Sequence, residues 1–450
     1  MRRQNKFSKG LWDEANISPA MAQSQQSWLR AFYNPPGWGD YLLSNLPATL
    51  TGFVATLVTG ELKLSCGSSP KGEFLTEQLH PLERRLSGAV QLAAACGMAV
   101  IRPLVVGGAF QFEVLGPGRF FPTRFGADGQ VMAGYFADFE ETDAGNYIRL
   151  ESFDCSGTDL RITNRAYRAQ GEVLAEEVPL STVTRWKALA PEILLQHVKK
   201  PLFGYLRMPF ANTVDGGSPL PVSIYAGAME SMAEFDRVYG ELIYELHSGK
   251  RKRIIERQAI SPERKGKSPG RGDLSGRGYR DISPDNYIVL DPMEQVRPFD
   301  DYSPQLRTED YLTGLKVILH MVENQCHLSP GTLSLDARTG TVTATEVISQ
   351  DRTTYSTCAA IQQSASQALL DVIEAMDVLS DLYRLCPAGK ISPAVSFGDS
   401  VFEDTQQEFS RRIEMVRAGI LRPEKLLEWY FDVDADTANT LLQSRQEVTA

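Results

Sequence analysis

Metal chemistry needs cysteine and histidine at particular spacings, and this chain does not supply them. Its six cysteines contain no CxxC pair, and its five histidines form no HxxxH or HExxH spacing. We therefore predict no zinc site and no bound metal or other cofactor. Cysteines spread this widely are typical of buried thiols in a reducing compartment. They are Cys66, Cys96, Cys155, Cys326, Cys358 and Cys386.

The motifs of nucleotide hydrolysis and of acyl transfer are also missing. Residues 67–72 lack the spacing of a Walker A loop and its Lys-Ser/Thr ending, and no GxSxG elbow occurs. The acidic run from Glu140 to Asp143 lies in a predicted hairpin turn, where a charge run is normally a solvated surface. We predict no catalytic residue and no enzymatic activity. A metal-dependent nucleic-acid-processing enzyme, with carboxylates from distant positions, stays open as an alternative.

Charge is distributed unevenly along the chain. The net charge is -10, whereas proteins that bind DNA tightly are usually basic. Residues 250–280 differ, with eleven basic and three acidic side chains in a segment rich in Gly, Pro and Ser. This composition predicts a flexible loop.

The pattern of apolar residues predicts an α+β fold. Residues 1–95 read as mostly helical, whereas 98–180 consist of short β-rich runs separated by turn signals. Within that region Ile148 and Leu150 alternate with Arg149 and Glu151. Such alternation is typical of a half-buried antiparallel meander with one apolar face.

Two amphipathic helices follow, separated by the basic stretch. The first is predicted over 223–248, with Gly249 at a left-handed C-terminal position. Its apolar positions are Ile224, Ala228, Met232, Phe235, Tyr239, Leu242 and Leu246. The second is predicted over 307–327. Its apolar face is formed by Tyr311, Leu312, Leu315, Ile318, Leu319 and Val322. Its polar face is formed by Glu309, Thr313, Lys316, His320, Glu323 and His327.

The C-terminal third is predicted to be helical. A Ser/Gly/Thr-rich loop over 328–342 precedes a long helix over 343–386, where Thr343 and Glu346 have capping-box spacing. Residues 387–450 then read as short helices, with Pro423 at a first helical position and Gly419 at a helix end. No apolar run reaches the roughly 18 residues of a membrane helix, so we expect no membrane association.

Several segments, taken together, resemble the portal proteins of tailed phages, in particular those of siphophages with Gram-positive hosts. The clearest is Lys200–Thr213, continuing through Ser218–Tyr225. Shorter ones are Asn34–Trp38, Ala55–Glu61, Thr343–Val347 and Gly398–Asp404. No single segment is a strict signature, and the resemblance rests on their common order over roughly residues 30–445.

The resemblance implies a portal fold with a mixed α/β wing, a two-helix stem, a small α/β clip, a long wing helix and a helical crown. It places the N-terminal and wing region at 1–222, the first stem helix at 223–248 and the clip at 249–306. The second stem helix would be 307–327 and the loop nearest DNA, the tunnel loop, 328–342. The long wing helix would be 343–386, and 387–450 would complete the wing and crown. The basic insertion at 250–280 is longer and more charged than expected for a clip.

The resemblance also implies a function. A portal is a ring, usually of twelve subunits, at one capsid vertex, through which double-stranded DNA is packaged and ejected. The implied partners are further copies of the chain, DNA, the terminase large subunit, a head-completion or adaptor protein, and the major capsid and scaffold proteins. The implied locations are the virion and, during assembly, the host cytoplasm. A minor capsid or scaffold-like interaction protein is the second reading.

Two sets of basic residues would then contact DNA or a partner. Lys316, His320 and Arg338 would form rings of charge that meet phosphate in the channel. The clip set would meet DNA or an acidic face of the packaging motor. It consists of Lys250, Arg251, Lys252, Arg253, Arg264, Lys265, Lys267, Arg271, Arg277 and Arg280.

Overall fold

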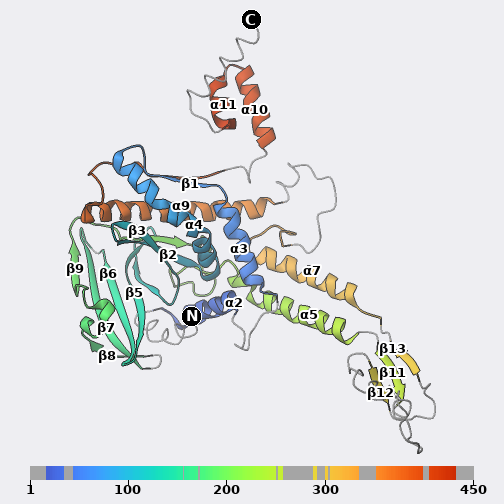
Figure 1. Cartoon of the computed structure of the whole chain (residues 1–450). Helices are drawn as coiled ribbons and strands as arrows, with labels where there is room; N and C mark the ends of the chain where they lie inside the picture. The colour runs from blue at the N-terminus through green and yellow to red at the C-terminus, as the bar shows by residue number, and fades with distance from the viewer. Residues whose placement is uncertain are drawn as a thin grey trace, which may run out of the picture. The chain divides into compact units, whose positions relative to one another are not determined.

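The computed structural model describes residues 17–34, 44–155, 157–170, 173–249, 252–256, 287–290, 299–302, 305–333, 351–398 and 405–431. They form an α+β protein with mostly antiparallel sheets, as predicted from the sequence (Figure 1). The chain divides into two compact units. Unit 1 contains 45–228, the chain from Glu323 onward and the N-terminal helix, and unit 2 contains Ser44 and 229–322.

Helices at both ends of the sequence belong to unit 1. Helix α4 begins at a serine cap, because Ser69 Oγ accepts a hydrogen bond from the Gly72 N–H at 3.0 Å. It ends at Gly97, where φ is 85° and a Cβ would lie 2.6 Å from the Pro221 carbonyl oxygen, so only glycine fits. The helices are α2 (Pro19–Tyr33), α3 (Leu46–Thr59), α4 (Pro70–Cys96), α9 (Arg352–Tyr383), α10 (Thr405–Arg417) and α11 (Pro423–Phe431).

Unit 1 also holds three sheets. Their orders are β10-β2-β3, β4-β5-β6-β7-β8 with β9 also paired to β7, and β1-β14. The strands of the first sheet are β2 (Met98–Val106), β3 (Ala109–Leu115) and β10 (Gly204–Arg207). Those of the second are β4 (Phe120–Phe125), β5 (Val131–Thr142), β6 (Gly145–Asp154), β7 (Leu160–Gln170), β8 (Val173–Val178) and β9 (Glu192–Leu195). Those of the third are β1 (Leu62–Ser65) and β14 (Ala394–Phe397).

The meander predicted over 98–180 is confirmed for β4 to β8 and wrong for β2 and β3. These two strands belong to a separate sheet, because β2 pairs with β10, about a hundred residues further along the chain. No local pattern reveals such a pairing. The 3₁₀ turns at Leu180–Thr182 and Thr184–Trp186 follow the meander.

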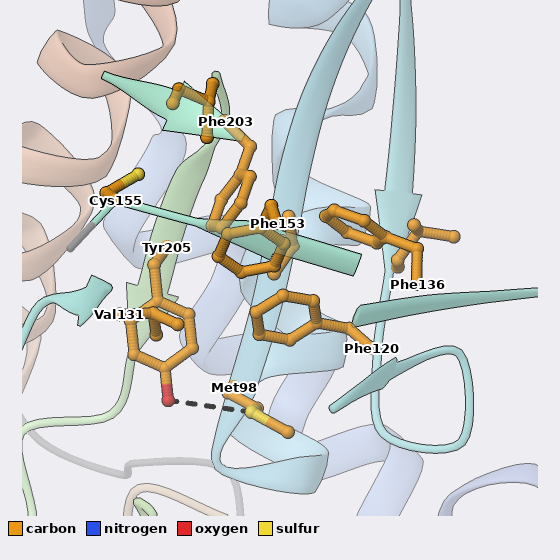
Figure 2. Packing of buried hydrophobic residues seen from close by; sticks show 11 residues of the cluster. Met98, Phe120, Val131, Phe136, Phe153, Cys155, Phe203 and Tyr205 are labelled. Carbon is orange, nitrogen blue, oxygen red and sulfur yellow. Dashed lines mark hydrogen bonds between the residues drawn. The ribbon is translucent and has the colours of Figure 1, made fainter. Parts of the chain in front are cut away.

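An aromatic core connects the meander with the sheet of β10 (Figure 2). The ring of Phe203, next to β10, lies 5.0 Å from that of Phe153 and 5.4 Å from that of Phe136. In the same cluster the Tyr205 hydroxyl lies 3.5 Å from the Met98 sulfur. Residues 203–205, part of the segment that carries the resemblance, therefore fill the core between the two sheets.

The C-terminal helices agree with the sequence in part. The start predicted at Thr343 lies outside the described residues, and α9 ends at Tyr383, where Arg384 adopts a left-handed conformation with φ of 51°. Pro423 is the first residue of α11 and Gly419 has φ of 71°, both as predicted. The end of the chain beyond 431 is not among the described residues.

Unit 2 consists of two helices and a small sheet between them in sequence. Its elements are α5 (Met229–Ser248), β11 (Lys252–Glu256), β12 (Tyr287–Leu290), β13 (Phe299–Tyr302) and α7 (Thr308–Gln325), the last turn of which belongs to unit 1. The sheet order is β12-β11-β13, with β11 parallel to β12 and antiparallel to β13. Parallel neighbours need a long crossover connection, and residues 257–286 connect these two strands. The flexible loop predicted over 250–280 is thus wrong for β11.

The first predicted helix begins later than its apolar spacing indicated. Helix α5 starts at Met229 and is preceded by a 3₁₀ turn, Ala226–Ala228. The residues before it are fixed within unit 1, because the Ile224 N–H donates to Ala94 O and the Tyr225 hydroxyl donates to Trp28 O, both at 3.0 Å. These long-range hydrogen bonds prevent the segment from joining the helix.

Gly249 ends α5 for a different reason from the one predicted. It is absent from the residues with positive φ among those described, and its N–H donates to Glu245 O at 2.8 Å. A Cβ at this position would collide with the side chain of Leu306. The glycine therefore permits a close approach within unit 2 and does not serve as a left-handed cap. Leu246, one of the apolar positions of the predicted helix, is 41% exposed.

Candidate nucleic-acid interface

Two of the three predicted channel residues share one face of α7. Lys316 and His320 lie four residues apart, which places them on the same side of a helix. His320 is exposed and Lys316 is half-buried. A different side of α7 is packed, since Leu315, Leu319 and Val322 are at most 3% exposed. The helix thus holds these two side chains in one row.

The surroundings of this row are acidic. Helix α5 carries five carboxylates, of which Asp236 is buried, and one arginine. Helix α7 carries three carboxylates, of which Glu323 is buried, and one lysine. Arg237 forms ion pairs with Glu241 and, at 2.6 Å, with Glu234. Since carboxylates outnumber cations on both helices, any contact of this surface with phosphate would be weak.

Within unit 2, an ion pair joins the end of α5 to the residue before α7, next to the small sheet. Arg307, directly before α7, lies 3.0 Å from Glu245 near the end of α5. The hydrogen bond from Arg307 holds the pKa of the Glu245 carboxyl below its usual value. Because the pair is partly exposed, it adds little to the stability of the protein. Its main effect is to hold the two helix ends near each other.

The end of α7 is shaped by a Schellman turn. The Leu328 N–H donates to Glu323 O at 2.8 Å, and the His327 N–H donates to Asn324 O at 3.2 Å. His327 takes the left-handed position with φ of 58°, where glycine is usual. Its ring stacks on Phe210, with centroids 5.0 Å apart and planes at 10°. The stacking explains why a side chain is present at this position.

Glu323 organises the loop that follows. Its side chain is fully buried, and its two oxygens accept hydrogen bonds from the Gly331 N–H at 2.8 Å and the Leu333 N–H at 2.6 Å. The prediction that Glu323 lies on a water-facing side of the helix was wrong. The chain folds back over this end of α7, which helical spacing alone does not show.

The same loop is attached to the start of α9. Ser329 and Thr354 exchange two hydrogen bonds, and Thr357 Oγ1 donates to His327 O at 2.7 Å. Thr332 Oγ1 donates to Ser329 O at 2.6 Å. Sequence reasoning missed these residues, and the only signal was the run of threonine and serine at the start of the helix. The base of the predicted tunnel loop, 328–333, is therefore rigidly positioned.

The structure describes only part of the basic sets. Lys252 and Arg253 lie in β11, where Lys252 is in register with Tyr302 and Arg253 with Asp301. Arg338 lies outside the described residues. So do the remaining members of the clip set, Lys250, Arg251, Arg264, Lys265, Lys267, Arg271, Arg277 and Arg280. Of the two basic sets, the described residues thus include Lys316 and His320 of the channel set and Lys252 and Arg253 of the clip set.

The acidic run and five of the six cysteines agree with the sequence predictions. The acidic run ends β5 at a tight hairpin in which Thr142 pairs with Gly145. Five of the six cysteines are buried and Cys386 is half-buried. Within the described ranges, no cluster of three or more His, Cys, Asp or Glu side chains could hold a metal ion. In the same ranges, no helix combines the length and the apolar character of a membrane span.

Comparison with known proteins gave matches among solved structures only. No family model and no curated protein matches the chain. The similar solved structures include the virion of a native gene transfer agent (GTA) particle and the neck of a native GTA particle computed with C12 symmetry. Their TM-scores are 0.44 and 0.43, with 12% identity each. They cover 91% and 90% of this chain and 94% and 92% of the matched chains. Scores and identities this low assign no function to the chain.

Proposed function

We propose that this chain is the subunit of a portal ring, through which double-stranded DNA enters and leaves a phage-like capsid at one vertex. In this proposal α5 and α7 are the stem helices, β11–β13 belong to the clip and α9 is the long wing helix. Residues 328–342 are the tunnel loop. The partners are further copies of the chain, DNA, the terminase, a head-completion protein and the capsid and scaffold proteins.

The observation that carries the proposal is the uncovered apolar surface of α5 and α7. Val317 and Met321 are 58% and 51% exposed, and Tyr244 of α5 is 73% exposed. Val317 and Met321 lie on the side of α7 roughly opposite its buried face. Val317 and Met321 are four residues apart on one side of α7, and exposed apolar residues grouped in this way mark an interaction site. In a ring, the neighbouring subunit would cover this face by a head-to-tail contact.

The distribution of charge is consistent with a path for DNA. The face of α7 that carries Lys316 and His320 lies between its buried face and its exposed apolar face. If both apolar faces are covered in the ring, this third face remains free for the channel. The acidic majority on both helices would keep each phosphate contact weak, so that DNA could slide.

Electron microscopy of the purified full-length protein tests the ring. We expect closed rings with a central hole wide enough for duplex DNA. Replacing Met321 with Glu should shift the protein to monomers, because it puts a charge into the apolar contact. Thr313→Glu on the polar face is the matched control and should leave the rings intact. A compact monomer without a hole, at every concentration, would refute the proposal.

The DNA contacts need a packaging assay. Replacing Lys316 or Arg338 with Ala should leave ring assembly unchanged but alter the yield or length of packaged DNA. Deleting residues 261–280 should weaken packaging or docking of the motor. Unchanged packaging in each case would remove these residues from the channel and the clip function, while the ring proposal would stand.

A further inference from the structure

A groove is formed within unit 1 alone. Its volume is about 730 Å³, which is within the range of ligand pockets. Its walls are the end of α2, one side of α4 and strand β3, and Arg185 closes one rim. The floor contains apolar side chains such as Leu92, Leu104 and Val114. The groove is thus a concave site with apolar side chains at its base.

One wall of the groove contains a glycine that the fold of the chain does not explain. Gly88 lies in the interior of α4, where glycine costs about 0.5–1 kcal/mol relative to alanine. A Cβ at Gly88 would meet no atom within 4 Å. By contrast, a Cβ at Gly72 of the same helix would lie 2.5 Å from Gly67 O, so packing within the chain requires that glycine. Gly88 therefore leaves room for another backbone to approach.

The opposite wall is the edge strand of its sheet. In the order β10-β2-β3, strand β3 has a neighbour on one side only. Side chains of α4 cover this edge at two points, since Gln78 Oε1 accepts from the Phe110 N–H and Arg85 donates to Phe112 O, both at 2.9 Å. An edge next to a groove favours an extended segment, which can add main-chain hydrogen bonds to the strand.

The rim of the groove is basic although the chain is acidic. Arg84, Arg85 and Arg185 line it, whereas its one carboxylate, Glu113, lies 3.3 Å from Arg119 outside the groove. Arg185 is 65% exposed and already pairs with Glu140 at 3.4 Å and with Asp138 at 3.8 Å, and such exposed pairs are weak. Within the described residues Arg84 is exposed and makes no ion pair. An occupant with carboxylates at the rim and apolar side chains on the floor would complement this surface.

We propose that this groove binds an extended acidic segment of a partner protein, with apolar side chains alternating with carboxylates. The segment lies between α4 and β3, its backbone passes Gly88, and its carboxylates pair with Arg84 and Arg185. The site does not depend on a ring or a DNA path.

Fluorescence anisotropy of the full-length protein tests this site. The probe is a short fluorescein-labelled peptide of alternating glutamate and leucine. We expect saturable binding that weakens as salt is added. Gly88→Trp should abolish binding by filling the groove, and should leave the fold intact because the space is open. Arg84→Glu combined with Arg185→Glu should weaken binding by at least about tenfold.

The matched control for Gly88→Trp is Gly157→Trp, which also enters open space but lies outside the groove. It should bind the peptide like the wild type, and circular dichroism should show both variants folded. Absence of binding to the wild type would overturn the proposal, as would equal binding by Gly88→Trp. Equal binding of a lysine–leucine peptide or of a labelled DNA duplex would overturn the acidic specificity. A changed oligomeric state in Gly88→Trp would indicate a second copy as occupant and would also overturn it.

Discussion

Ser329 and Thr354 cap one another across the start of α9. The Ser329 N–H donates to Thr354 Oγ1 at 2.8 Å, and the Thr354 N–H donates to Ser329 Oγ at 3.2 Å. Both residues are at most 2% exposed. The residue before the helix, Asp351, makes no capping hydrogen bond with its side chain. A serine from the preceding loop therefore satisfies a donor that a helix start leaves open.

Thr354→Val should destabilise the protein. The change keeps the shape of the side chain but leaves the buried Ser329 N–H without its acceptor, at a cost of about 1–3 kcal/mol in the free energy of unfolding. Thermal and denaturant unfolding would measure the loss. Thr353→Val is the control, because Thr353 is exposed. Equal stability of the two variants would contradict the role of this hydrogen bond.

Glu323→Gln should loosen the start of the loop after α7. The buried carboxylate accepts from two backbone N–H groups, of Gly331 and Leu333, whereas an amide offers one oxygen and turns an NH₂ group toward the other donor. Faster hydrogen exchange at these two amides is the expected result. The exposed Glu309→Gln should leave their exchange unchanged. Unaltered protection in Glu323→Gln would show that the loop is held by other contacts.

The buried thiols should make the protein sensitive to alkali. Burial raises the pKa of Cys66 and Cys155 to about 11 and that of Cys358 to about 12, from an ordinary value of 9.0. A raised thiol pKa means that the folded state holds its proton more tightly than the unfolded chain. The stabilisation is complete below pH 9.0 and is lost as the pH rises toward 11. Unfolding measured against pH should show this decline.

Alkylation is a second test of the burial of the cysteines. Iodoacetamide at mildly alkaline pH should label Cys386, which is half-buried, before the buried cysteines. Peptide mass spectrometry identifies the labelled residue, and the unfolded protein is the control in which all six should react. Rapid labelling of Cys66 in the folded protein would be incompatible with its burial.

Gln25→Leu should stabilise the protein. Gln25 of α2 is fully buried, and neither polar atom of its amide has a hydrogen-bond partner. Replacing such a group by an apolar one of similar size should raise the free energy of unfolding by about 1–3 kcal/mol. Gln23→Leu at an exposed position of the same helix is the comparison and should have little effect. A loss of stability in Gln25→Leu would show that the amide has a function.

Gly314→Trp should block ring closure without unfolding the subunit. Gly314 lies on the same side of α7 as Val317 and Met321, and a Cβ there would meet no atom within 4 Å. In a single chain the larger side chain therefore fits, whereas a neighbouring subunit on this face would collide with it. Mass photometry should find fewer closed rings, with circular dichroism unchanged. Normal rings would place the subunit contact elsewhere.

The sequence by itself determined those features that depend on neighbouring residues. Apolar spacing located α7 within two residues at each end, alternation located the meander from β4 to β8, and Pro423 located the start of α11. It also predicted that the cysteines are buried, which holds for five of the six. These features follow from the periods of the helix and the strand and from backbone restrictions at single residues.

Tertiary structure alone decided the features that depend on distant residues. Pairing with β10 places β2 and β3 in a sheet separate from the meander. Hydrogen bonds of Ile224 and Tyr225 make α5 begin later than its apolar spacing indicated. Glu323 is buried and binds the following loop instead of facing water. A helical or strand period describes which residues share a face, but not which part of the chain will cover that face. The covering segment is selected by packing and by hydrogen bonds between residues far apart in sequence.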